Sequence, residues 1–193
     1  MRHRTFSALL INIRRFVVKA YSHKNIRVSR ADLGKDPNEV SAMFDGVAKR
    51  YDIINDLLSL GRTKAWRKVA TKIIGPKSGM KILDIAAGTG SSSRPLRDAG
   101  ADVIPLDFSK GMLDAGRKRN PDLPFTKGDA LNLPFKENEF DVTTISFGLR
   151  NTSDTLKALK EAFRVTKAGG RIVVVEFSHP KRSEEHTSEL QSH

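Results

Sequence analysis

The 193-residue chain has no cysteine, which excludes disulfide bonds, thiolate nucleophiles and cysteine-ligated metals. Its five histidines all lie outside residues 24–178. We therefore expect no Ser-His-Asp triad and no metal site in that stretch. The sequence also lacks an apolar run of 18 or more residues, so it predicts no membrane-spanning helix.

The net charge of +12 is unevenly distributed. Residues 1–31 contribute +8 and residues 182–193 contribute −2, which leaves +6 for the stretch between them. A mildly basic domain of this kind does not require a nucleic-acid partner, and we expect none. Attraction to an anionic membrane surface is equally compatible with this charge.

Three segments differ in composition. Residues 1–33 form a basic extension that is typical of a mitochondrial transit peptide. Two alternatives are a basic tail and a start assigned too far upstream, with translation beginning at the codon of Val28. Residues 182–193 resemble the translation of a sequencing adapter, and we interpret them as an artefact rather than a polar tail. Residues 34–181 then form one domain that is truncated at its C-terminal end.

Within this domain, helices are predicted over 36–47, 55–60 and 65–74, and strands then alternate with helices. The predicted strands cover residues 81–87, 102–108, 125–127, 140–147 and 171–177, and the predicted helices cover 92–99, 110–118 and 154–165. This alternation predicts an α/β fold with a parallel sheet and helices on both faces. With the last strands missing, strand 171–177, which follows a predicted turn at 167–170, would be an exposed apolar edge.

The first strand of the alternation ends in a glycine loop, L-D-I-A-A-G-T-G, over Leu83–Gly90. Ligands of doubly wound sheets bind at such strand ends, and Gly88 and Gly90 allow close approach of the backbone. A dinucleotide fingerprint would need a third glycine, where Ser93 stands. Asp84 instead suits a cationic ligand such as S-adenosylmethionine. A simple strand-to-helix turn is the third interpretation.

Polar residues also follow the next three strands. Asp107 can accept hydrogen bonds from both ribose hydroxyls, or it can act as a turn acid or N-cap near Ser109. Asp129 can accept a hydrogen bond from the adenine amino group, with the amide of Ala130 beside it. Ser146 ends the fourth strand. Together these positions indicate a nucleoside site more specifically than any of them alone.

Several motifs between residues 34 and 180 resemble those of the quinone-ring C-methyltransferases of menaquinone and ubiquinone biosynthesis. They are D-x-A-x-G-T-G, D-F-S-x-G-M-L, G-D-A-x-x-L-P-F, T-I-S-F-G-L-R-N and the upstream M-F-D-G-V-A-K-R-Y-D. The last is more similar to the actinobacterial demethylmenaquinone methyltransferases than to the ubiquinone enzymes. Residues 91–93 depart from the family, in which an acid often follows the glycine loop.

This resemblance implies a Rossmann-like methyltransferase fold that uses S-adenosylmethionine. The implied reaction is C-methylation of a polyprenyl hydroquinone, demethylmenaquinol to menaquinol. The cofactor contacts expected from the resemblance and the glycine loop are Asp84, Gly88, Thr89, Asp107, Asp129, Ala130 and Ser146.

Tyr51, Arg150 and Asn151 are the candidate catalytic residues. Arg150 is too basic to act as a direct base, but it could orient a water molecule or stabilise a phenolate. Asn151 and Tyr51 could hydrogen-bond the ring. The structural alternatives are core packing for Tyr51, and capping of the helix near Asp154 for Arg150 and Asn151.

Three other functions stay open. They are methylation of another small molecule or of RNA, nicotinamide-dependent oxidoreduction, and a non-catalytic cofactor-binding subunit. For the quinone enzyme, we expect peripheral contact with the inner face of the cytoplasmic membrane through the N-terminal helices. A mitochondrial matrix location would follow from a transit peptide, and a homodimer is compatible with the sequence.

Overall fold

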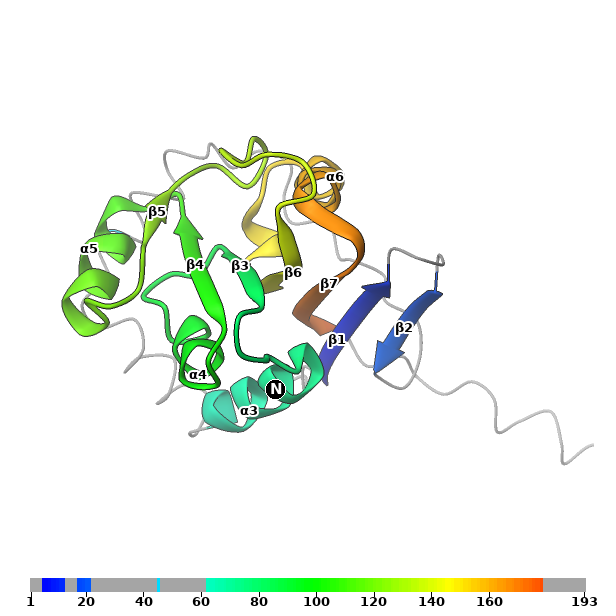
Figure 1. The fold of residues 1–193 in the computed structure, drawn as a ribbon, viewed down its shortest axis with the longest axis horizontal. Helices are drawn as coiled ribbons and strands as arrows, with labels where there is room; N and C mark the ends of the chain where they lie inside the picture. Colours follow the sequence, from blue (N-terminus) through cyan, green and yellow to red (C-terminus); the bar gives the residue numbers. More distant parts are fainter. Residues whose placement is uncertain (1–4, 13–16, 22–44, 46–61, 179–193) are drawn as a thin grey trace, which may run out of the picture.

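The computed structural model describes residues 5–12, 17–21, 45 and 62–178, and Figure 1 shows their arrangement. A seven-stranded sheet has the order β2-β1-β7-β6-β3-β4-β5. Its strands are β1 (Thr5–Asn12), β2 (Val17–Tyr21), β3 (Lys81–Ile85), β4 (Asp102–Asp107), β5 (Thr126–Lys127), β6 (Phe140–Ser146) and β7 (Thr166–Ser178). Strands β3 to β7 are parallel, whereas β1 and β2 are antiparallel additions at one side.

Helices cover both faces of the parallel strands, as predicted (Figure 1). The helices are α3 (Arg62–Ile74), α4 (Ser93–Asp98), α5 (Lys110–Arg119) and α6 (Thr155–Val165), with a 3-10 turn η1 (Leu149–Asn151) before α6. Helices α3, α4 and α5 share one core cluster with the sheet, and α6 belongs to the other. None of the helices in the described ranges is long and apolar enough to cross a bilayer.

Alternating side chains on each strand divide the core into these two clusters. On β3, Ile82 faces α3, α4 and α5, whereas Leu83 faces α6; on β7, Val173 and Val174 divide in the same way. All four side chains are buried. Strands with apolar residues on both faces are typical of a parallel sheet covered by helices on each side.

Strand β7 differs from its prediction in two respects. It begins at Thr166, so the predicted turn at 167–170 lies inside the strand. The pairing with β6 is irregular there, because Thr166 pairs with Phe140 and the next pair is Arg171 with Val142. Its outer edge is not exposed, because β1 pairs along it from Asn12–Arg171 to Thr5–Ser178. The expectation of an exposed edge was therefore wrong. The backbone groups of an open edge need partners, and β1 provides them.

The strand order reverses beside β3. After β3 the chain adds β4 and β5 on one side, and then returns to add β6 and β7 on the other. In open α/β sheets, ligands bind at the carboxyl ends of the strands where the order reverses. This rule points to the ends of β3, β4 and β6. The predicted helices at 36–47 and 55–60 lie almost wholly outside the described residues.

Candidate active site

The loop between β3 and α4 carries unusual backbone conformations. Ala86, Gly88 and Gly90 have φ angles of 55°, 58° and 78°. A Cβ on Gly90 would lie 2.6 Å from Cζ of Phe125, so this position requires glycine for both its conformation and its packing. Phe147, which follows β6, also has a positive φ, at 60°. Strained positions of this kind cluster at ligand sites.

Asp84 lies beneath this loop and is fully buried. Its Oδ2 accepts hydrogen bonds from the hydroxyls of Ser92 at 2.7 Å and Ser93 at 2.6 Å. Burial raises the pKa of this carboxyl to about 6, although both hydroxyl groups oppose the shift. Ser93, which breaks the dinucleotide fingerprint, therefore serves to hold the carboxylate against the start of α4.

Two buried polar atoms beside this loop lack a hydrogen-bond partner. They are Oδ1 of Asp84 and Oγ1 of Thr144, and the two residues are register partners on β3 and β6. A buried acceptor without a donor costs about 1–3 kcal/mol. An ammonium donor would satisfy the Asp84 oxygen, so the site fits a cationic ligand better than a phosphate. Thr144 was not among the predicted site residues, because its place beside Asp84 follows from the pairing of β3 with β6 and not from the local sequence.

Asp107 at the end of β4 connects two loops. Its Oδ2 accepts a hydrogen bond from the backbone N–H of Gly88 at 2.8 Å, and its Oδ1 accepts one from Ser109 at 2.8 Å. Burial raises the pKa of Asp107, against the effect of these N–H groups. The turn-acid alternative is thus observed, but Asp107 is not the cap, because Ser109 caps α5 through Met112 at 3.1 Å.

Asp45, in the M-F-D motif, touches the same region. Its Oδ1 accepts hydrogen bonds from the hydroxyl of Ser109 at 2.5 Å and from the N–H of Gly111 at 2.7 Å. These two donors lower the pKa of Asp45. The motif supported the family resemblance, but the sequence did not indicate that its acid would meet the start of α5. Contacts over 64 and 66 residues have no local sequence signal.

Asp129 and Ala130 follow β5. Oδ1 of Asp129 accepts a hydrogen bond from the N–H of Leu131 at 2.8 Å, and its backbone forms a bridge with Asn132. The side chain of Asp129 is exposed, and that of Ala130 is partly buried. The structure joins this turn to Asp107, whose carbonyl accepts the N–H of Gly128 at 3.1 Å. The two predicted ribose and adenine contacts are therefore neighbours.

Thr89 and Ser146 are the other predicted cofactor contacts. Thr89 is 1% exposed, and its carbonyl accepts a hydrogen bond from Asn120 at 3.4 Å. Ser146 is half-buried at the end of β6. Gly148 brings the next turn against the glycine loop, because a Cβ there would clash with Cβ of Ala86. The ends of β3 and β6 are therefore in direct contact.

Arg150 and Asn151 form part of η1, directly after the end of β6. The Arg150 guanidinium pairs with the carboxylate of Glu176 on β7. The capping alternative does not describe Arg150 and Asn151, because Asp154 itself caps α6 by accepting the N–H of Lys157 at 2.9 Å. Glu176 was not predicted as a site residue. Tyr51 lies outside the described residues.

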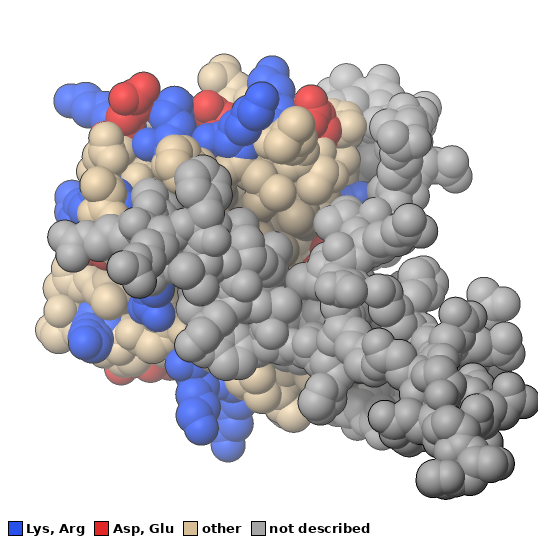
Figure 2. Space-filling model, turned by 90° about the vertical axis from the view of Figure 1, so that its right-hand side faces the viewer, with Lys and Arg blue, Asp and Glu red and all other residues tan. Residues whose placement is uncertain are grey.

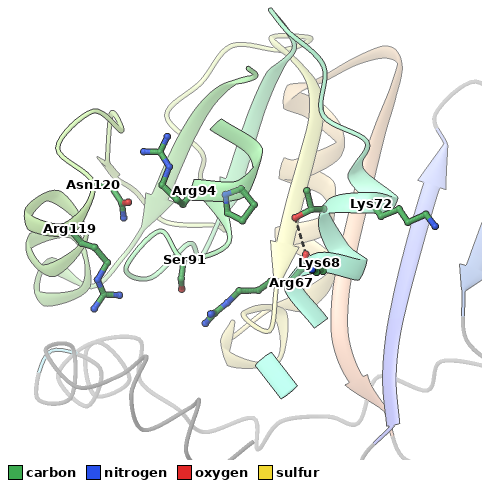
Figure 3. A pocket seen from close by; sticks show the side chains of 9 residues that line it. Arg67, Lys68, Lys72, Ser91, Arg94, Arg119 and Asn120 are labelled. Atoms are coloured by element: carbon green, nitrogen blue, oxygen red, sulfur yellow. Dashed lines mark hydrogen bonds between the residues drawn. The ribbon is translucent and has the colours of Figure 1, made fainter. Parts of the chain in front are cut away.

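A basic pocket of about 550 Å³ opens next to the glycine loop. Its lining includes Ser91 and five cationic residues from α3, α4 and α5, and no acidic residue: Arg67, Lys68, Lys72, Arg94 and Arg119. Figure 3 shows the guanidinium groups of Arg67 and Arg119 on the same side as the Ser91 hydroxyl. Arg94 is paired with Asp98 and Asp122. The charged ends of Arg94 and Lys72 point away from Ser91 in Figure 3, so Arg67 and Arg119 are the candidate cations for an anionic group such as a carboxylate.

The face shown in Figure 2 carries both acidic and basic side chains. Along the upper edge of that face, acidic and basic side chains alternate. Several described surface cations are paired with carboxylates, as in Lys110–Asp114 at 2.6 Å and Lys167–Asp141 at 2.8 Å. Within the part of the chain that the structure describes, no group of three or more potential metal-ligating side chains gathers.

Solved structures share this fold. A SAM-dependent methyltransferase from Thermotoga maritima is similar with a TM-score of 0.58 and 28% identity, covering 69% of this chain and 59% of that one. The YcgJ protein from Bacillus subtilis is similar with a TM-score of 0.56 and 26% identity, covering 58% of this chain and 50% of that one. The Rossmann-like methyltransferase fold is thereby confirmed.

Curated relatives are more similar in sequence. A demethylmenaquinone methyltransferase of Paenarthrobacter aurescens is 56% identical over 153 residues, covering 79% of this chain and 60% of the relative. That of Streptomyces avermitilis is 58% identical over 153 residues, covering 79% and 66%. The chain thus spans less than two thirds of the length of either relative.

The likeness to the quinone methyltransferases is confirmed by a family model as well. The model of the ubiE/COQ5 methyltransferase family matches residues 32–188, a range that contains the glycine loop and all the predicted site residues. The chain therefore belongs to the ubiE/COQ5 methyltransferase family.

Proposed function

We propose that the protein methylates a ring carbon of demethylmenaquinol with S-adenosylmethionine as methyl donor. The relatives named demethylmenaquinone methyltransferase support the substrate. The observation that carries the choice of cofactor is the buried Asp84 carboxylate with its unpartnered Oδ1. The ammonium of S-adenosylmethionine would satisfy this oxygen, whereas the pyrophosphate of a dinucleotide would be repelled by it.

The other cofactor contacts follow the strand ends. Asp107 accepts hydrogen bonds from the ribose hydroxyls, Asp129 and the Ala130 amide bind the adenine edge, and Thr89 and Ser146 complete the site between β3 and β6. Gly88 lets the loop backbone approach the cofactor. The basic pocket beside Ser91 suits the carboxylate at the amino-acid end.

S-adenosylmethionine supplies a methyl group on a cationic sulfur; transfer breaks that sulfur–carbon bond, forms a carbon–carbon bond to the ring and releases S-adenosylhomocysteine and a proton. The chain's task is to hold the ring carbon in line and to accept that proton through water. Arg150 orients the water or stabilises the phenolate, Asn151 holds a ring oxygen, and Tyr51 hydrogen-bonds the ring or the water.

Because the polyprenyl tail of the substrate is long and apolar, the enzyme must reach this substrate at a membrane. We propose peripheral binding at the inner face of the cytoplasmic membrane, aided by exposed cations of α3 such as Lys68 and Lys72. Flotation of the full-length protein with vesicles of phosphatidylglycerol should recover it with the lipid. Protein that stays at the bottom of the gradient would contradict this part of the proposal.

Calorimetric titration tests the cofactor first. The full-length protein encoded by the gene, and the 193-residue chain, would each be titrated with S-adenosylmethionine and with NADH. Binding of S-adenosylmethionine alone, followed by methylation of demethylmenaquinol, supports the proposal. Binding of NADH alone by the full-length protein would overturn it, and methylation of RNA or another small molecule in place of the quinol would overturn the substrate.

A further inference from the structure

Glu176 on β7 holds Arg150 by two separate contacts. Its Oε1 accepts a hydrogen bond from Nη1 of the guanidinium, and its Oε2 accepts one from the backbone N–H of Arg150 at 3.3 Å. One carboxylate thus fixes both the main chain and the side-chain end of the same residue. The two residues are 26 positions apart in the sequence, so the contact exists only in the folded sheet.

The position of Glu176 places it at the ligand edge of the sheet. It follows Val175, which is the register partner of Ser146 at the end of β6. The carbonyl of Val175 also accepts the N–H of Phe147, the residue with positive φ, at 2.7 Å. Glu176 therefore lies where β7 supports the turn that leads from Ser146 to Arg150.

We propose that Glu176 is a positioning residue for Arg150 in methyl transfer, an inference that rests on the proposed function. A long arginine side chain loses considerable rotamer freedom when it is ordered. A carboxylate that engages part of the guanidinium fork fixes its plane in advance. A guanidinium whose plane is fixed in this way keeps one orientation toward a water molecule or a ring oxygen, which is what stabilising developing charge requires.

A second glutamate in the chain also binds an arginine side chain and a backbone N–H, but the two groups belong to different residues. Glu161 accepts hydrogen bonds from Arg164 at 2.7 Å and from the backbone N–H of Leu133 at 2.8 Å. The side chains of Glu161 and Glu176 are almost equally exposed, at 17% and 18%. Glu161 lies on α6 rather than at a strand end. Glu161→Gln is therefore a matched control for the loss of a carboxylate that holds an arginine.

The test compares Glu176→Gln and Glu161→Gln in the full-length protein. For each variant, kcat and KM for demethylmenaquinol, Kd for S-adenosylmethionine and Tm are measured. Glu176→Gln should lower kcat by about 10- to 100-fold, because a small misplacement near the reacting atoms has effects of this size. Its Kd for the cofactor should stay within about twofold, whereas Glu161→Gln should lower Tm alone. If Glu176→Gln does not fold, Glu176→Asp replaces it. This variant keeps the charge on a shorter side chain, and it should lower kcat by less than the loss expected for Glu176→Gln.

A double-mutant cycle identifies the route of the effect. In an Arg150→Ala background, Glu176→Gln should change kcat by less than about twofold, because residues that act as one unit are not additive. The positioning role is overturned if Glu176→Gln keeps its full effect in that background. It is also overturned if, in both glutamate variants, the loss of stability measured as Tm fully explains the loss of kcat. If the wild-type protein methylates the quinol and Glu176→Gln matches it, only this inference falls. A wild-type protein that neither binds S-adenosylmethionine nor methylates the quinol overturns the proposed function together with it.

Discussion

The carboxylate of Asp107 accepts a hydrogen bond from the backbone N–H of Gly88 at 2.8 Å, across 19 residues of sequence. This bond ties the end of β4 to the glycine loop that follows β3. The same carboxylate holds the N–H of Ser109 at the start of α5. One side chain therefore sets the spacing between two neighbouring walls of the proposed cofactor site.

Asp107→Asn should weaken the binding of S-adenosylmethionine about 10- to 100-fold, as expected for the loss of a hydrogen bond to a charged group. An amide offers one acceptor oxygen, so one of the two backbone N–H groups also loses its partner. Calorimetric titration measures the change in Kd. Asp114→Asn is the control, since Asp114 pairs with Lys110 on the surface of α5. Equal effects of the two variants would contradict the role of Asp107.

Asp84 should make the ligand-free protein less stable as the pH rises. The pKa of Asp84 is raised to about 6 in the folded protein, above an ordinary aspartate pKa of about 3.9. Between about pH 4 and 6, the folded state therefore binds more protons than the unfolded state, and this contribution to the free energy of unfolding falls by about 3 kcal/mol.

Urea unfolding from pH 4 to 7 checks this contribution by comparing the wild type with Asp84→Asn. Asp107 interacts electrostatically with Asp84, so the difference between the free energies of unfolding of the two proteins reports Asp84 together with its effect on Asp107. It should shift in favour of the variant as the pH rises. Saturating S-adenosylmethionine should reduce the shift, because its ammonium favours the ionised carboxylate. A difference that is constant with pH would refute the assignment.

Gly90→Ala should destabilise the protein by about 2–4 kcal/mol, through an unfavourable backbone angle and overpacking. The new Cβ would lie 2.6 Å from the Phe125 ring at a φ of 78°. Gly79→Ala is matched in backbone angle, with a φ of 73°, but has nothing within 4 Å of its Cβ. It should cost only about 1 kcal/mol. Urea denaturation gives both values, and equal losses would show that Phe125 does not constrain the loop.

Arg150→Ala in the full-length protein should lower kcat by about 100-fold or more, a loss typical of removing a preorganised hydrogen-bond donor from an active site. The Kd for S-adenosylmethionine should stay nearly unchanged, because Arg150 lies beyond the predicted cofactor contacts. Arg164→Ala serves as the control, since Arg164, on α6, binds Glu161 and the carbonyls of Phe135 and Leu133 in the loop before β6. It should reduce Tm without a comparable loss of kcat. An equal loss of cofactor affinity in Arg150→Ala would remove the proposed catalytic role.

The sequence by itself determined the alternation of strands and helices and the strand ends that carry the site. These features are local: apolar runs such as 172–175, the glycines of the loop and acids at the end of a strand have a fixed spacing along the chain. Periodicity and turn chemistry are enough to place them. The same local order placed Asp84, Asp107 and Asp129 at the ends of successive parallel strands.

Only the tertiary structure decided what these residues touch. Asp84 lies beside Thr144 because β3 pairs with β6, and each of the two side chains has a buried oxygen without a partner. The two bonds of Asp107 depend on the loops that follow two different strands. Glu176 reaches Arg150 only because β7 lies beside β6. The covering of β7 by β1 reversed the expectation of an open edge. Such contacts join residues far apart in sequence and follow from strand order, which local spacing does not contain.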